Sequence, residues 1–89
     1  MISIDSVSNE RIKSAVKIAS SAKTRRQTGM FFLEGLRLCR DAAVTGYDID
    51  SFFVNARAYE RFKEDADFIA DKARNAFIIS DPVENKLAL

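Results

Sequence analysis

The chain has 89 residues, of which 47% are hydrophobic, and this is enough for one compact core. Its single cysteine, Cys39, cannot form a disulfide within the chain, and the lack of histidine excludes a histidine-based triad and the usual zinc sites. The net charge of +1 is unevenly distributed: residues 1–46 carry eight Lys/Arg and four Asp/Glu, while residues 47–89 carry six and nine.

The N-terminal sequence M-I-S-I-D-S-V-S-N lacks the charged and apolar regions of a signal peptide. No apolar run approaches the roughly 18 residues that a membrane span needs. We therefore expect a cytoplasmic protein in a reducing compartment, without a membrane partner.

In chain order, Ile2 and Ile4 alternate with polar residues and predict a short extended arm. A helix follows, with Ser8 or Asn9 as its N-cap and Glu10 in its first turn. Four apolar residues of this helix have helical spacing and are expected to share a buried face: Ile12, Ala15, Val16 and Ala19. Lys13 and Lys17 form a basic ridge elsewhere on it, although such a ridge is also typical of a solvated face.

The sequence K-T-R-R-Q-T-G, residues 23–29, predicts a cationic turn-forming loop that contains Lys23, Arg25 and Arg26. The apolar run 30–33 is too short for a helix and predicts a strand covered on both sides. A helix is predicted over residues 36–45, with Gly46 as its stop. Cys39 has the spacing of a buried small apolar residue in that helix.

A second strand is predicted over residues 51–54, followed by a helix that breaks near residues 64–67 and is capped by Asn75. Residues 76–80 predict a third strand, and Asp81 as N-cap with Pro82 begins a last helix. Strands separated by helices imply an α/β fold whose mainly parallel or mixed sheet has helices on both faces.

Candidate catalytic groups are few. Glu34 follows the predicted strand 30–33 but has no histidine, cysteine or second carboxylate nearby in sequence, and Gly29 and Gly35 do not form a phosphate-binding fingerprint. Asp65, Asp67 and Asp71 lack the turn of a metal loop, so we predict a solvated face and no metal site. The basic residues fit nucleic-acid binding better than they fit a catalytic or metal site. Charge alone does not distinguish this function from a protein-docking surface or a merely solvated one.

Three stretches, S-V-S-N-E-R-I-K, K-T-R-R-Q-T-G-M-F-F-L-E-G-L-R-L-C-R-D-A and F-F-V-N, resemble the N-terminal substrate-binding domain of the SpoU-type (TrmH family) RNA 2′-O-ribose methyltransferases. The resemblance covers essentially the whole chain. The matching positions are Ser8, Asn9, Ile12, Lys13, Lys23, Arg25, Gly29, Phe31, Glu34, Gly35 and Arg37.

This resemblance implies an L30e-like three-layer α/β/α sandwich over residues 1–89 that recognises structured ribosomal or transfer RNA. The candidate RNA-binding residues are Asn9, Lys13, Lys17, Lys23, Arg25, Arg26 and Arg37. Gly29, Glu34 and Gly35 are expected to form a structural or polar junction beside them. In such proteins a C-terminal knotted domain binds S-adenosylmethionine and transfers the methyl group, usually in a homodimer, so we expect no cofactor and no methyl transfer from these residues alone.

Two alternative functions are also compatible with the sequence. Asn9, Glu10 and Lys13 also look like the element with which L7Ae-type proteins of the same broad fold bind kink-turn RNA, although Ser8 stands where those proteins usually have glycine. In the second alternative, the domain serves dimerisation or protein docking, and its basic segment is only a solvated surface.

Overall fold

A computed structural model describes residues 1–88 and contains a three-stranded parallel sheet with six helices. The strands are β1 (Ile2–Ile4), β2 (Ser51–Asn55) and β3 (Asn75–Ile79), in the order β1-β3-β2. The helices are α1 (Glu10–Ser20), α2 (Ala22–Thr28), α3 (Leu36–Thr45), α4 (Ala56–Arg61), α5 (Lys63–Lys72) and α6 (Asp81–Leu87). The predicted α/β class is confirmed, whereas the finer L30e-like assignment stays a prediction.

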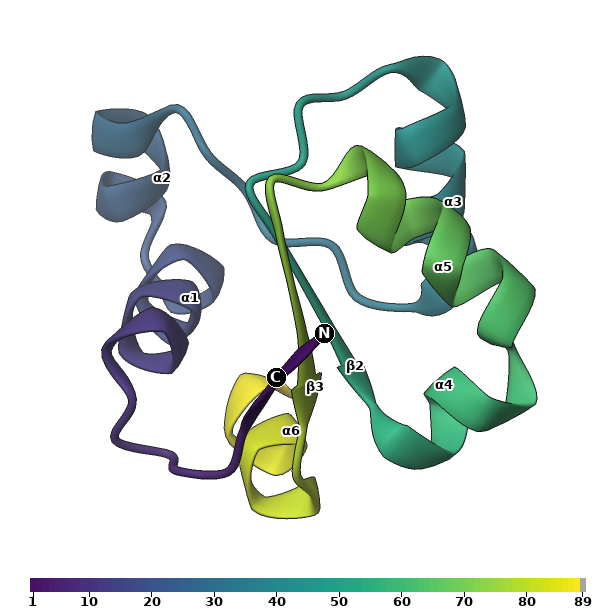
Figure 1. Ribbon diagram of the computed structural model, residues 1–89. Coiled ribbons are helices and arrows are strands. Elements are labelled where there is room, and N and C mark those ends of the chain that lie inside the picture. The colour runs from purple at the N-terminus through teal and green to yellow at the C-terminus, as the bar shows by residue number, and fades with distance from the viewer. Residues whose placement is uncertain (89) are drawn as a thin grey trace.

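The sheet separates two layers of helices (Figure 1). On one side lie α1, α2 and α6, and on the other lie α3, α4 and α5. The central strand β3 serves both layers, because Phe77 and Ile79 pack toward α1 and α6 while Ala76 and Ile78 pack toward α3 and α5. This alternation is the period of two expected for a strand that is covered on both faces.

Three predicted helices are confirmed with nearly the predicted bounds. Asn9 is the N-cap of α1 and accepts a hydrogen bond from the Arg11 N–H at 2.8 Å. Helix α3 ends at Gly46, whose φ of +88° is readily adopted only by glycine. Helix α6 begins one residue earlier than predicted, with Ser80 rather than Asp81 at the N-cap position.

The predicted loop over residues 23–29 is wrong, because residues 22–28 form helix α2. Ser21 caps this helix by accepting from the Thr24 N–H at 3.1 Å, and Gly29 ends it with a φ of +70°. None of its residues is buried, so α2 leaves no apolar periodicity in the sequence. The caps at its two ends therefore stabilise this helix where core contacts are lacking.

The predicted strand over residues 30–33 is also wrong. This segment is irregular, and Phe31 is largely exposed rather than covered on both sides. It carries the chain from one helical layer to the other: Phe32 packs against the cluster beneath α1, and Leu36 packs against the cluster beneath α3. The strand that completes the sheet is instead β1, the predicted extended arm, which pairs with β3.

Smaller corrections concern element ends. The break between α4 and α5 falls at Phe62, before the predicted region, and Asn75 starts β3 instead of capping a helix.

Cys39 is half-buried, and this burial raises the pKa of its thiol. Across residues 1–88, no helix has both the length and the apolar character to cross a bilayer.

Candidate nucleic-acid interface

Helices α1 and α2 form the most basic part of the molecule, and we call them the basic helix pair. Residues 10–28 contain six Lys/Arg and one Glu, a net charge of +5, whereas the remaining sequence contains eight and twelve, a net charge of −4. The two helices pack against each other and share Ser21, which closes α1 and caps α2. The excess positive charge of the first half of the sequence therefore lies on this pair of helices.

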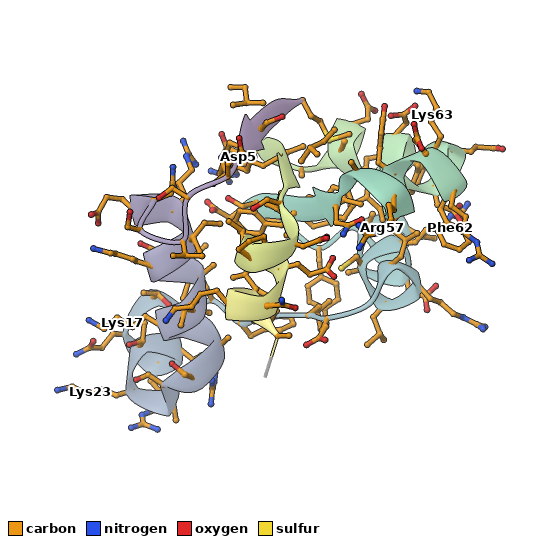
Figure 2. All side chains as sticks on the ribbon, turned by 90° about the horizontal axis from the view of Figure 1, so that it is seen from below. Asp5, Lys17, Lys23, Arg57, Phe62 and Lys63 are labelled. Atoms are coloured by element: carbon orange, nitrogen blue, oxygen red, sulfur yellow. The ribbon has the colours of Figure 1, made fainter. Side chains whose placement is uncertain are left out.

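Four of the predicted RNA-binding cations lie exposed on this unit: Lys13, Lys17, Lys23 and Arg26. Figure 2 shows Lys17 and Lys23 projecting into solvent from the same end of the molecule. Phe62 and Lys63 lie at the opposite end in that view. The structure therefore brings residues from two helices onto one basic surface.

Half of the eight cations elsewhere in the fold are held in ion pairs with carboxylates. Four ion pairs join residues outside the basic helix pair: Arg40 with Asp65 (2.8 Å), Arg57 with Asp81 (2.9 Å), Lys63 with Asp67 (3.0 Å) and Arg74 with Asp48 (2.6 Å). Within the basic helix pair, the described residues form one ion pair, between Lys13 and Glu10 at 3.8 Å, and its side chains are 59% and 90% exposed. An exposed pair of this kind is weak, so the helix pair keeps most of its positive charge available.

Arg25 differs from the other basic residues of α2 because its side chain is used within the fold. Its Nη1 donates to the carbonyl oxygens of Ile18 and Ala19, both at 2.9 Å. These carbonyls lie in the last turn of α1, where backbone acceptors lack helical partners and where positive charge is favoured by the helix dipole. Arg25 therefore fastens α2 to the C-terminal end of α1.

Replacing Arg25 with alanine should lower the free energy of unfolding by about 1.5 to 3 kcal/mol, because two carbonyl acceptors lose a charged donor. Urea denaturation followed by circular dichroism measures this change. Arg26→Ala is the matched control, since Arg26 is exposed on the same helix and should shift stability by less than about 0.5 kcal/mol. Equal effects of the two variants would contradict the proposed role of Arg25.

The other predicted site residues are not gathered on this surface. Arg37 is exposed in the first turn of α3, which lies on the opposite side of the sheet from α1 and α2 (Figure 1). The Asn9 side chain caps α1, and Glu34 is exposed beside Gly35, whose φ of +104° sets the entry into α3. With Gly29 ending α2, the two glycines bound the crossing segment between the layers.

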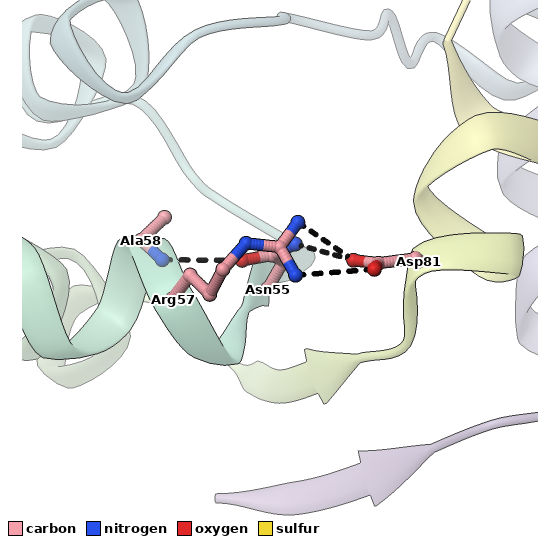
Figure 3. Close-up of polar contacts among 4 residues, drawn as sticks. All are labelled: Asn55, Arg57, Ala58 and Asp81. Atoms are coloured by element: carbon pink, nitrogen blue, oxygen red, sulfur yellow. Dashed lines mark hydrogen bonds and ion pairs between the residues drawn. The ribbon is translucent and has the colours of Figure 1, made fainter.

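A polar cluster that sequence reasoning missed lies at the carboxyl ends of β2 and β3 (Figure 3). The buried Asn55 donates through Nδ2 to Asp81 at 3.0 Å and accepts through Oδ1 from the Ala58 N–H at 3.1 Å. Arg57 donates to both carboxylate oxygens of Asp81, at 2.9 and 3.1 Å, and these hydrogen bonds lower the pKa of Asp81. The sequence does carry a signal for half of this cluster, because an asparagine that follows an apolar strand is a typical N-cap.

Two of the four acidic residues of α5 pair with neighbouring side chains. Asp65 pairs with Arg40, while Asp67 accepts from the Tyr59 hydroxyl at 2.7 Å and from Lys63 at 3.0 Å. The hydrogen bond from Tyr59, followed by that from Lys63, lowers the pKa of Asp67. Within residues 1–88, no three metal-ligating side chains come close enough together to hold an ion.

Comparison with protein families gives a match that covers most of the chain. A family model described as MRM3-like substrate binding domain matches residues 9–89, which is nearly the entire chain. The match confirms the resemblance to an N-terminal substrate-binding domain of SpoU-type methyltransferases. Comparisons with curated proteins and with solved structures yield no match.

Proposed function

The chain belongs to the MRM3-like substrate binding domain family, and from this premise we propose that it binds the RNA substrate of a 2′-O-ribose methyltransferase. The family description implies substrate binding in an MRM3-like methyltransferase. We propose structured ribosomal or transfer RNA as that substrate. In this proposal the parent enzyme's catalytic domain, acting in a homodimer, supplies S-adenosylmethionine chemistry, and residues 1–89 hold the RNA.

The observation that supports RNA binding is the uncompensated charge of the basic helix pair. Lys17, Lys23 and Arg26 are exposed, and the described residues place no carboxylate within ion-pair distance of them. Lysine and arginine in such a position contact phosphate oxygens and release condensed counterions from the nucleic acid. Such contacts fix the position of an RNA and carry little sequence information, which suits a domain that presents a substrate to a separate active site.

The chain is expected to bind an unmodified transfer RNA transcript with an affinity that falls steeply with salt. If three or four cations contact phosphates, the slope of log affinity against log salt concentration should lie between about −2 and −4. Filter binding at several salt concentrations measures this slope. Lack of binding at low salt, or an affinity that does not change with salt, would exclude the basic helix pair as a phosphate-binding surface.

A further inference from the structure

A second candidate binding surface is lined by residues other than Lys17, Lys23 and Arg26. It is a groove of about 920 Å³ at the side of β2 that does not pair with β3. Its walls are the inner face of α1, the crossing segment 29–36 and the C-terminal end of α6, and β2 lies along it. This volume lies within the range of pockets that hold ligands.

The free edge of β2 runs along this groove. Strand β2 pairs with β3 on one side, and no backbone hydrogen bond among the described residues joins its other side to a neighbour. The segment 30–33 lines the same groove without such a bond to β2. Alternate N–H and C=O groups of an edge strand point outward, so β2 offers backbone donors and acceptors to an added strand.

Two exposed aromatic rings also line the groove. Phe31 is 55% exposed and Tyr47 is 60% exposed, and their rings meet edge to face with centroids 5.9 Å apart. Phe32 and Phe53 are half-buried in the same lining. Large apolar side chains beside unpaired strand backbone suit a ligand that has both a peptide backbone and apolar side chains.

The charge of the groove is opposite to that of the basic helix pair. Five exposed carboxylates line it. Glu34, Asp50 and Glu84 form no ion pair among the described residues, whereas Glu10 lies 3.8 Å from Lys13 and Asp48 is paired with Arg74. Its only cation among the described lining residues, Arg11, lies over the Phe77 ring at 4.9 Å from the ring centroid. Phosphate groups would be repelled here, whereas lysine and arginine side chains would be attracted.

We propose that this groove binds an extended basic segment of a partner protein, which adds a strand to the free edge of β2. The segment alternates apolar and basic side chains, because successive residues of a strand point to opposite sides. Its apolar side chains pack against Phe31 and Tyr47, and its Lys/Arg side chains face Glu34 and Glu84. A segment of about five residues matches the length of β2.

The test uses a fluorescent peptide of about six residues that alternates lysine with valine, and a matched peptide that alternates glutamate with valine. The lysine peptide should bind saturably, measured by fluorescence anisotropy, and at least about tenfold more tightly than the glutamate peptide. In ¹⁵N-correlated NMR spectra its binding should shift the amide signals of residues 51–55. Equal binding of both peptides, or shifts confined to other residues, would overturn the proposal.

Charge variants sharpen the test. The double variant Glu34→Gln with Glu84→Gln should weaken binding of the lysine peptide about three- to tenfold. The control, Glu60→Gln with Glu64→Gln, removes the same charge from exposed positions outside the groove and should change binding less than about twofold. Equal weakening by both pairs would show nonspecific attraction and refute the site. Two further results also refute a peptide partner: RNA that shifts the β2 amides, or self-association that protects them.

Discussion

Replacing Asn55 with alanine is expected to lower the free energy of unfolding by about 2 to 4 kcal/mol, a larger effect than that of Arg25→Ala. Asn55 is 5% exposed, and its side chain makes two hydrogen bonds, one that caps α4 and one to the Asp81 carboxylate. Alanine removes the cap and leaves Asp81 with Arg57 as its remaining partner in the cluster. Both losses destabilise the same edge of the sheet.

Urea denaturation at neutral pH measures this loss, with Asn85→Ala as the matched control. Asn85 lies exposed on α6, close in sequence to Asp81, and its replacement should change stability by less than about 0.5 kcal/mol. A loss below about 1 kcal/mol for Asn55→Ala would show that the cluster contributes little. Asn55→Asp tests the donor separately, because an aspartate still caps α4 but faces the Asp81 carboxylate with like charge.

The same cluster shows where sequence reasoning ends. Asn55 and Asp81 are separated by 26 positions, and they meet because parallel strands bring their carboxyl ends to one edge of the sheet. The local sequence pattern can predict the hydrogen bond by which Asn55 caps α4, but it cannot predict that Asp81 accepts the other hydrogen bond. The pairing depends on which strands are neighbours, and strand order is a tertiary property.

Elements with a buried face were predictable. Helices α1 and α3 carry apolar residues at helical spacing between recognisable caps, and both were predicted within one or two residues. Helix α2 has no buried residue, so its only sequence signals are Ser21 and Gly29 at its ends. Apolar periodicity in a sequence reports a buried helix face, so a helix without a buried face is not predicted by this pattern.

The segment 30–33 shows the opposite error. Its apolar run satisfies the strand pattern, yet a strand also needs a neighbour with which to exchange backbone hydrogen bonds. In this fold the segment lines the groove beside the free edge of β2 without a backbone hydrogen bond to it, and the chain crosses there between the two helical layers. Composition alone does not distinguish a covered strand from an apolar crossing segment.

Within the candidate site, the sequence predicts the same RNA-binding role for Arg25 and for Arg26. The structure separates them, because Arg25 donates to α1 carbonyls while Arg26 is exposed. A variant that removes both would therefore confuse loss of folding with loss of binding. The informative charge variant leaves Arg25 in place and changes Lys17, Lys23 and Arg26.

The triple variant Lys17→Gln, Lys23→Gln and Arg26→Gln is expected to weaken transfer RNA binding roughly 10- to 100-fold at low salt. Each lost phosphate contact should also reduce the salt slope by about 1. Glutamine keeps helix propensity close to that of lysine and arginine, so the fold should persist. Filter binding across a salt series gives both quantities, and circular dichroism checks the fold.

The matched control removes three exposed cations outside the basic helix pair, in the variant Arg61→Gln, Lys72→Gln and Lys86→Gln. Both triple variants lower the net charge by the same amount, so a long-range effect of total charge weakens binding equally in each. A surface made by α1 and α2 instead predicts less than about a threefold change in the control. If the control lost as much affinity as the test variant, RNA binding would follow from overall charge, and the basic helix pair would not be the interface.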